Sequence, residues 1–69
     1  MPLALLQTGD TACVARISGN DRIRNHLAEL GFTPGSDVKV ISKHGGGVIV
    51  NIKESRIALN RDMASRIMV

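Results

Sequence analysis

Aromatic residues are almost absent from this sequence. Phe32 is the only one, and the chain has no tryptophan or tyrosine. Modules that bind proline-rich peptides use grooves lined by aromatic side chains, and modules that bind single-stranded nucleic acids stack bases on such side chains. The composition therefore excludes a proline-rich ligand and argues against a single-stranded nucleic acid.

Cysteine is equally scarce. Cys13 is the single cysteine among 69 residues, so an internal disulfide is excluded and a four-ligand zinc knuckle is not expected. A lone thiol suits a reducing cytosol. Because one core in a chain of this size supplies only about 3–5 kcal/mol, aliphatic packing has to stabilise the fold. We expect one domain that comprises residues 1–69.

Long apolar runs are missing as well. No stretch approaches the ~20 residues needed to cross a bilayer. The apolar residues 1–6 are too few, and lack the basic flank, for a signal peptide. We therefore expect a cytoplasmic protein that does not insert into a membrane. Nine Lys and Arg against six Asp and Glu make it mildly basic, which permits an acidic partner.

The groupings required for catalysis or nucleotide binding are also lacking. His26 and His44 are the only histidines, the carboxylates are scattered, and no serine has the context of a nucleophile elbow. The sequence HGGG at residues 44–47 is typical of a hairpin tip. The HGGG oxyanion loop of some esterases is similar, but it requires a G-x-S-x-G nucleophile elbow, which this chain lacks. No G-x-x-x-x-G-K-[ST] loop is present. We predict that the chain is not an enzyme and has no catalytic or cofactor-binding residue.

Residues 18–36 carry the clearest structural signal. Ile23, Leu27 and Leu30 follow the i, i+4, i+7 spacing that places them on one face of a helix. Asn20 is a favourable N-cap, and Asp21 places a carboxylate at the positive end of the helix dipole. The sequence therefore predicts an amphipathic helix that begins near residue 21, with Ser18 as an alternative start.

The end of this helix is marked by a second signal. Gly31 fits the left-handed position just after a helix, where a Schellman ending would pack Phe32 against Leu27. Pro34 and Gly35 then suit the two central positions of a type II turn.

Short strand-like runs surround the helix. Residues 11–17 predict a first strand with a bulge near 15–16, because Val14 and Ile17 cannot otherwise share a face. Residues 37–43, 48–53, 56–59 and 66–69 predict the others, with tight turns at 44–47 and 54–55. Asn60 is expected to cap a single helical turn, 61–65, that places Met63 under the sheet. We predict a mainly β fold, a small closed barrel of about five strands with one helix after the first strand and a helical turn before the last.

The sequence resembles the FeoA family of small SH3-like barrels associated with bacterial ferrous iron uptake. The matching segments are residues 6–9, 14–19, 24–35, 38–40, 48–50, 57–59 and 63–69. The block L-x-E-L-G-F-x-P-G, residues 27–35, is the most specific of them. The resemblance implies a cytosolic accessory of a FeoB-type iron transporter, whose cytosolic end carries a GTP-binding domain. The same domain type forms the C-terminal module of metal-dependent repressors.

Metal binding is the first alternative. Cys13, His26 and His44 are the only soft or borderline ligands, and none shows C-x-x-C or H-x-x-x-H spacing. We interpret Cys13 as a small buried side chain on a strand and His26 as partly packed beside the buried helix face. No cofactor is required on this interpretation, although the family's association with iron leaves weak transition-metal binding open, for example at His44.

Nucleic acid is the second alternative. Lys39, Lys43, Lys53 and Arg56 are expected on one solvent face of the hairpins, which would form a basic patch. A solvated basic face is the simpler interpretation, because such charges keep small domains soluble. We therefore expect no nucleic-acid partner.

The predicted contact surface for the transporter is the polar side of the helix with the turn beside it. Its residues are Arg22, Asn25, Glu29, Thr33, Pro34 and Gly35. Ile41, Ile49 and Met68 lie on the predicted outer faces of their strands and offer an alternative apolar patch.

Overall fold

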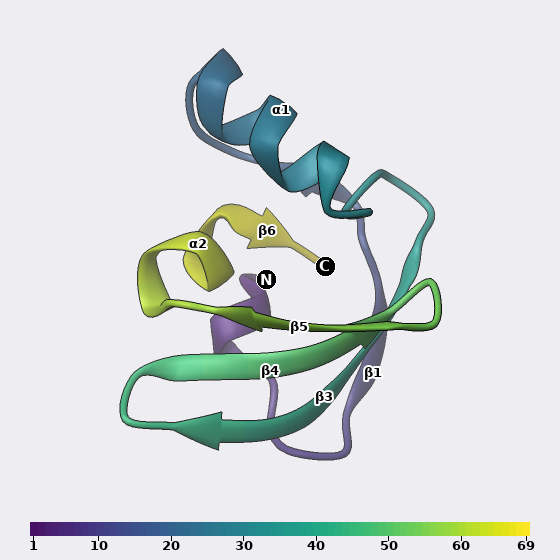
Figure 1. Cartoon of the computed structure of the whole chain (residues 1–69), viewed down its shortest axis with the longest axis vertical. Coiled ribbons are helices and arrows are strands. Elements are labelled where there is room, and N and C mark those ends of the chain that lie inside the picture. The colour runs from purple at the N-terminus through teal and green to yellow at the C-terminus, as the bar shows by residue number, and fades with distance from the viewer.

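A computed structural model describes all residues, 1–69, of the chain. Its strands form two antiparallel sheets, one with the order β1-β3-β4-β5 and one that pairs β2 with β6 (Figure 1). The elements are η1 (Leu3–Leu5, a 3-10 turn), β1 (Thr11–Cys13), β2 (Arg16–Ile17), α1 (Asp21–Glu29), β3 (Asp37–His44), β4 (Gly47–Ile52), β5 (Ser55–Leu59), α2 (Arg61–Arg66) and β6 (Ile67–Met68).

The predicted first strand is divided into two. The backbone N–H of Val14 donates to Ser36 (2.8 Å), and that of Ala15 donates to Met68 (2.8 Å), so the chain leaves the large sheet and joins the small one between these two residues. The predicted bulge at 15–16 is therefore a full break, and the fold has six strands instead of five. The break lets buried Val14 and half-buried Ile17 both face the core.

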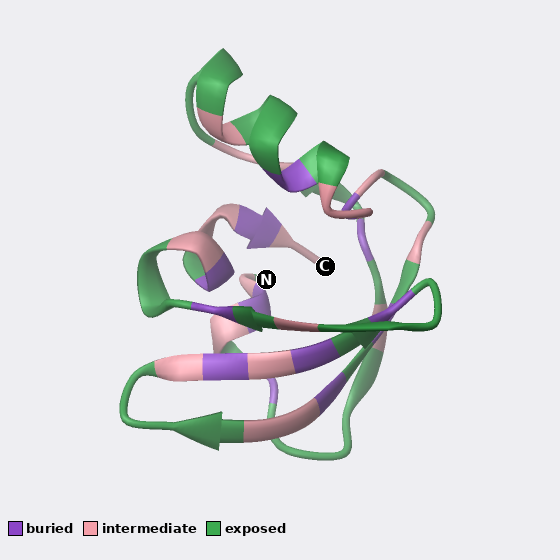
Figure 2. Ribbon diagram, viewed as in Figure 1, coloured by how far each residue is buried: buried purple, intermediate pink, exposed green.

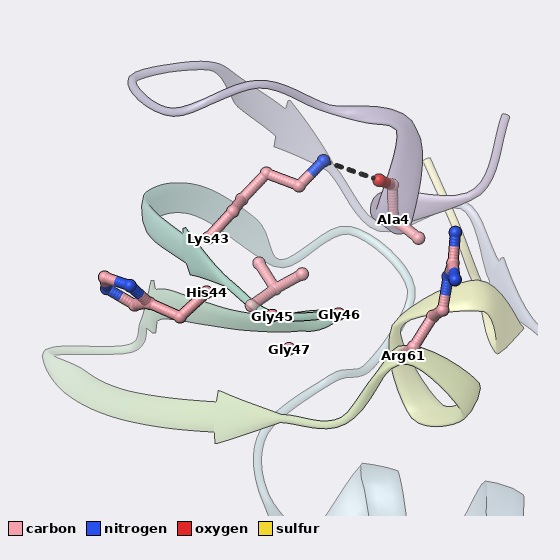
Figure 3. A pocket seen from close by; sticks show the side chains of 8 residues that line it. Ala4, Lys43, His44, Gly45, Gly46, Gly47 and Arg61 are labelled. Carbon is pink, nitrogen blue, oxygen red and sulfur yellow. Dashed lines mark hydrogen bonds between the residues drawn. The ribbon is translucent and has the colours of Figure 1, made fainter.

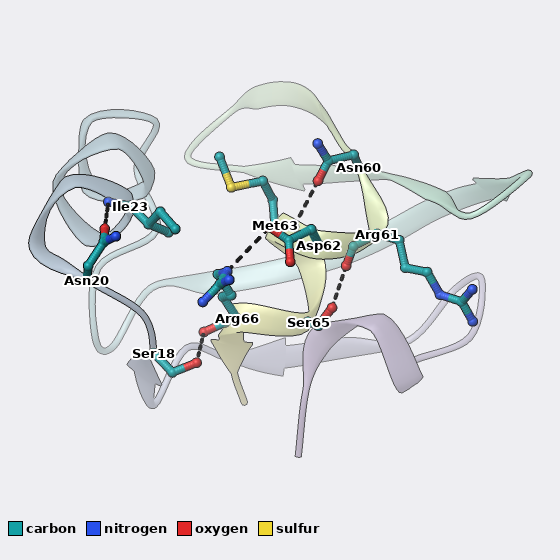
Figure 4. Close-up of polar contacts among 9 residues, drawn as sticks. All are labelled: Ser18, Asn20, Ile23, Asn60, Arg61, Asp62, Met63, Ser65 and Arg66. Carbon is teal, nitrogen blue, oxygen red and sulfur yellow. Dashed lines mark hydrogen bonds and ion pairs between the residues drawn. The ribbon is translucent and has the colours of Figure 1, made fainter.

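The predicted helix and both of its ends are confirmed. The side chain of Asn20 accepts a hydrogen bond from the N–H of Ile23 (3.0 Å), as Figure 4 shows. At the other end, Gly31 has φ +111°, and the N–H of Phe32 donates to the carbonyl of Leu27 (3.0 Å). The latter is the bond of a Schellman motif, and it brings the fully buried Phe32 beneath the last turn.

The predicted turn after the helix is also confirmed. The N–H of Ser36 donates to the carbonyl of Thr33 (3.0 Å), and Gly35 between them has φ +91°. These are features of a type II turn with Pro34 at its first central position.

Two tight hairpins connect β3, β4 and β5. The inward residues of β3 and β4 are buried as predicted: Val38, Val40, Val48, Val50 and Ile52. The second turn lies one residue earlier than predicted, because Lys53 and Glu54 both adopt positive φ (47° and 66°) and Ser55 already belongs to β5. Positive φ at both central residues is what a two-residue type I′ hairpin requires.

A β-bulge in β3 was not predicted, and it reverses the side on which the following residues lie. The register shifts between Val40 and Ser42, so Lys43 pairs with Val48, whose side chain is buried. Lys43 therefore does not share the outer face of Lys39, and the predicted single basic face is wrong at this residue.

The C-terminal segment follows its predicted order. Asn60 caps α2 by accepting a hydrogen bond from the N–H of Met63 (2.8 Å). Met63 packs against the core as a half-buried side chain, and Ala64 is the fully buried residue of α2. Backbone bonds between Met1 and Val69 (2.8 and 2.9 Å) hold the two ends of the chain side by side (Figure 1).

The core consists only of hydrophobic residues. Its 13 buried members come from almost every element: Leu3, Leu6, Val14, Leu27, Phe32, Val38, Val40, Val48, Val50, Ile52, Leu59, Ala64 and Ile67. None of the helices has the length and hydrophobicity needed to span a lipid bilayer.

Candidate functional site

Helix α1 covers one end of the barrel and leaves most of its own surface exposed (Figure 2). Leu27 is its only fully buried residue, while Ile23 and Leu30 are half-buried against the core. The polar side, with Arg22, Asn25 and Glu29, faces solvent as expected. Of the neighbouring turn, Pro34 and Gly35 are exposed and Thr33 is half-buried.

A groove of about 340 Å³ separates α1 from this turn and from β2. It includes three of the predicted contact residues, Asn25, Thr33 and Pro34. The structure does not bring Arg22, Glu29 or Gly35 into the lining. These three residues are exposed on the outer surface.

Five further residues that line the groove were not predicted from the sequence to belong to the contact surface. They are Arg16, Ile17, Arg24, Ala28 and Phe32. Arg24 and Ala28 follow the i, i+4 spacing and share a side of α1, so the helical pattern alone could have placed them beside Asn25. Arg16 and Ile17 could not be found in this way, because their position depends on the break between β1 and β2.

The charged residues that line the groove are all positive. Arg16 and Arg24 line it, and no carboxylate does. The guanidinium of Arg24 forms an ion pair with Asp21 one turn earlier, whereas Arg16 makes no ion pair within the chain. Ile17, Phe32 and Pro34 also line the groove and supply apolar atoms. The groove therefore suits a partner segment that has apolar side chains next to an acidic one.

The turn that forms one wall of the groove is firmly held. The N–H of Gly35 donates to the carbonyl of Val14 (2.8 Å), while Val14 donates in turn to Ser36 (2.8 Å). The hydroxyl groups of Thr33 and Ser36 lie 2.9 Å apart, within hydrogen-bond distance. Such preorganisation reduces the entropy lost when a partner binds.

The metal-ligand candidates lie on three separate elements. Cys13 is exposed on β1, which corrects the prediction that it is buried. His26 is exposed on α1 instead of partly packed, and His44 is exposed at the end of β3. No three His, Cys, Asp or Glu side chains are grouped in a way that could hold a metal ion.

The alternative apolar patch does not form a separate exposed surface. Ile41, Ile49 and Met68 are all half-buried. Ile41 lies at the bulge of β3, Ile49 pairs with Ser42 across the hairpin, and Met68 pairs with Arg16 in the small sheet.

The fold and the groove define a small β barrel with one helix inserted after its first strands, of the kind known as SH3-like. The family model for the FeoA domain matches residues 1–69. The chain belongs to the FeoA family.

Individual relatives agree with this assignment. The chain is 37% identical over 68 residues to a Methanocaldococcus jannaschii protein named "Putative Fe(2+) transport protein A", a match that covers 99% of this chain and 83% of the relative. It is similar to the crystal structure of an iron uptake regulatory protein, FeoA, with a TM-score of 0.93, 33% identity and coverage of 100% and 93% of the two chains. It also resembles Stenotrophomonas maltophilia FeoA, described as a prokaryotic SH3 domain protein and solved with zinc, with a TM-score of 0.88, 32% identity and coverage of 100% and 88%.

Proposed function

We propose that this chain is a cytosolic, non-enzymatic accessory of ferrous iron transport that binds the cytosolic side of a FeoB-type GTP-binding transporter. Membership of the FeoA family and the name of the archaeal relative support the role in Fe(2+) transport. The groove between α1 and the turn supports the mode of action. It combines apolar side chains with two arginines and no carboxylate, and hydrogen bonds hold the turn that forms one of its walls, which suits a protein-binding surface.

The contact surface has a centre and a periphery on this proposal. Asn25, Thr33 and Pro34 form the centre together with the missed Arg16. Arg22, Glu29 and Gly35 contact the partner at the exposed periphery, where charges affect the rate of association more than the affinity.

The proposed role needs no bound cofactor. Binding through the groove uses only side chains and backbone of this chain, and Cys13, His26 and His44 lie outside its lining. Addition of Zn²⁺ or Fe²⁺ should therefore leave the affinity for the transporter unchanged, and a metal-dependent affinity would contradict this part of the proposal.

The test is an amide NMR titration of the chain with the soluble GTP-binding domain of the transporter. We expect saturable shifts at residues 16–17, 24–28 and 32–35. Arg16→Glu should weaken binding about tenfold, or about 1.4 kcal/mol, because an acidic partner segment would then be repelled. Arg56→Glu is the matched control, since Arg56 is also exposed but lies on β5 outside the groove. Equal losses in the two variants, or no saturable shifts, would refute binding through the groove.

A further inference from the structure

A second concavity, of about 400 Å³, lies at the tip of the β3–β4 hairpin. Its walls are Ala4 of η1, Lys43 of β3, the glycines at 45–47 and Arg61 of α2 (Figure 3). It shares no residue with the groove beside α1.

Lys43 gives this concavity a fixed positive charge. The bulge in β3 turns its side chain toward η1, where the ammonium donates to the carbonyls of Ala4 (2.9 Å) and Leu6 (3.0 Å). An ammonium has three donors, so one N–H remains available. Because the two carbonyls already hold the side chain, little rotamer freedom remains to be lost when a ligand binds.

Arg61 adds a second positive charge. Its side chain makes no ion pair within the chain, and no carboxylate lines the concavity. Its planar guanidinium offers up to five donors in a geometry that matches the oxygens of carboxylates and phosphates.

The hairpin tip adds backbone donors. Gly45 and Gly46 adopt positive φ (51° and 103°), and their amides donate to no other group of the chain. A Cβ built on either glycine would meet nothing within 4 Å, so the backbone at the tip is open to a ligand. Successive free N–H groups in a turn form a concavity that attracts anions.

We propose that this hairpin-tip concavity binds a phosphate group, which Lys43, Arg61 and the amides of Gly45 and Gly46 would contact together. The volume lies in the range of small-ligand sites. No aromatic side chain is available to stack a nucleobase, so the recognised part is the phosphate itself, either as free inorganic phosphate or as part of a small phosphate ester. The site is independent of the proposed contact with the transporter.

The test is an amide NMR titration at constant ionic strength with inorganic phosphate and, separately, with glycerol 3-phosphate. We expect saturable shifts centred on Gly45, Gly46 and Arg61, and chloride at the same ionic strength should not reproduce them. Tighter binding of the ester would identify a phosphorylated small molecule as the ligand, whereas tighter binding of inorganic phosphate would identify the free ion.

Arg61→Gln separates a built site from general attraction of anions. We expect it to raise the dissociation constant at least fivefold, while Arg56→Gln, the same change at an exposed arginine of β5, should leave it unchanged. Lys43→Gln should have a similar effect, but that lysine also holds η1 through its hydrogen bonds to Ala4 and Leu6. Arg61→Gln is therefore the variant that tests the proposed site. Equal weakening by the two arginine variants, or shifts that do not saturate, would overturn the proposal.

Discussion

The end of α1 offers a sharp test of how the sequence specifies this fold. Gly31 adopts φ +111° and completes the Schellman motif that brings Phe32 under the helix. A Cβ at this position would lie 3.5 Å from the side chain of Lys53 and 3.9 Å from that of Ile52, which is ordinary contact. The penalty of a substitution therefore comes from the backbone and not from a clash at Cβ.

The magnitude follows from this geometry. A side chain in the positive-φ region costs about 1–2 kcal/mol, so Gly31→Ala should lose about that much stability. Gly31→Val should lose more, because branching at Cβ is poorly tolerated there. Gly31→Asn should lose less, because asparagine adopts this region more readily. For a domain of this size, each 1 kcal/mol corresponds to a decrease of roughly 4–8 °C in Tm.

Urea and thermal unfolding of these three variants would measure the effect. We expect stability to decrease in the order wild type, Gly31→Asn, Gly31→Ala and Gly31→Val. A Val variant as stable as the wild type would show that the helix does not end through a positive-φ glycine.

Three smaller predictions concern the cap, the core and the thiol. Asn60→Ala should cost about 1 kcal/mol in urea unfolding, because the N–H of Met63 loses its acceptor, and an unchanged midpoint would argue against this cap. Leu27→Ala should cost about 2–5 kcal/mol in the same assay, since Leu27 is the fully buried residue of α1; a loss below 1 kcal/mol would mean that the helix is loosely attached. Cys13 should react stoichiometrically with a thiol reagent in the native protein, because it is exposed, whereas protection until unfolding would indicate burial.

The local signals in the sequence predicted most of the fold. Caps and turns depend on a few neighbouring residues, so they can be recognised from the local sequence. This applies to the signals at Asn20, Gly31, Pro34 and Asn60. The alternation of valines in β3 and β4 likewise identified the buried face.

The features that sequence reasoning missed depend on distant parts of the chain. The break at Val14 and Ala15 is fixed by hydrogen bonds to Ser36 and Met68, so no local pattern reveals it. The bulge before Ser42 depends on the register with β4, and it decides where Lys43 points. The groove and the hairpin-tip concavity both follow from these two irregularities, which is why the candidate site could be predicted only in part.

The groove between α1 and the turn is the proposed binding site for the transporter. The most direct measurement compares the affinities of the wild type, Arg16→Glu and Arg56→Glu for the soluble GTP-binding domain by isothermal titration calorimetry. We expect about a tenfold loss of affinity for Arg16→Glu and wild-type affinity for Arg56→Glu. Wild-type affinity in both variants, or the same loss in both, would contradict this proposal.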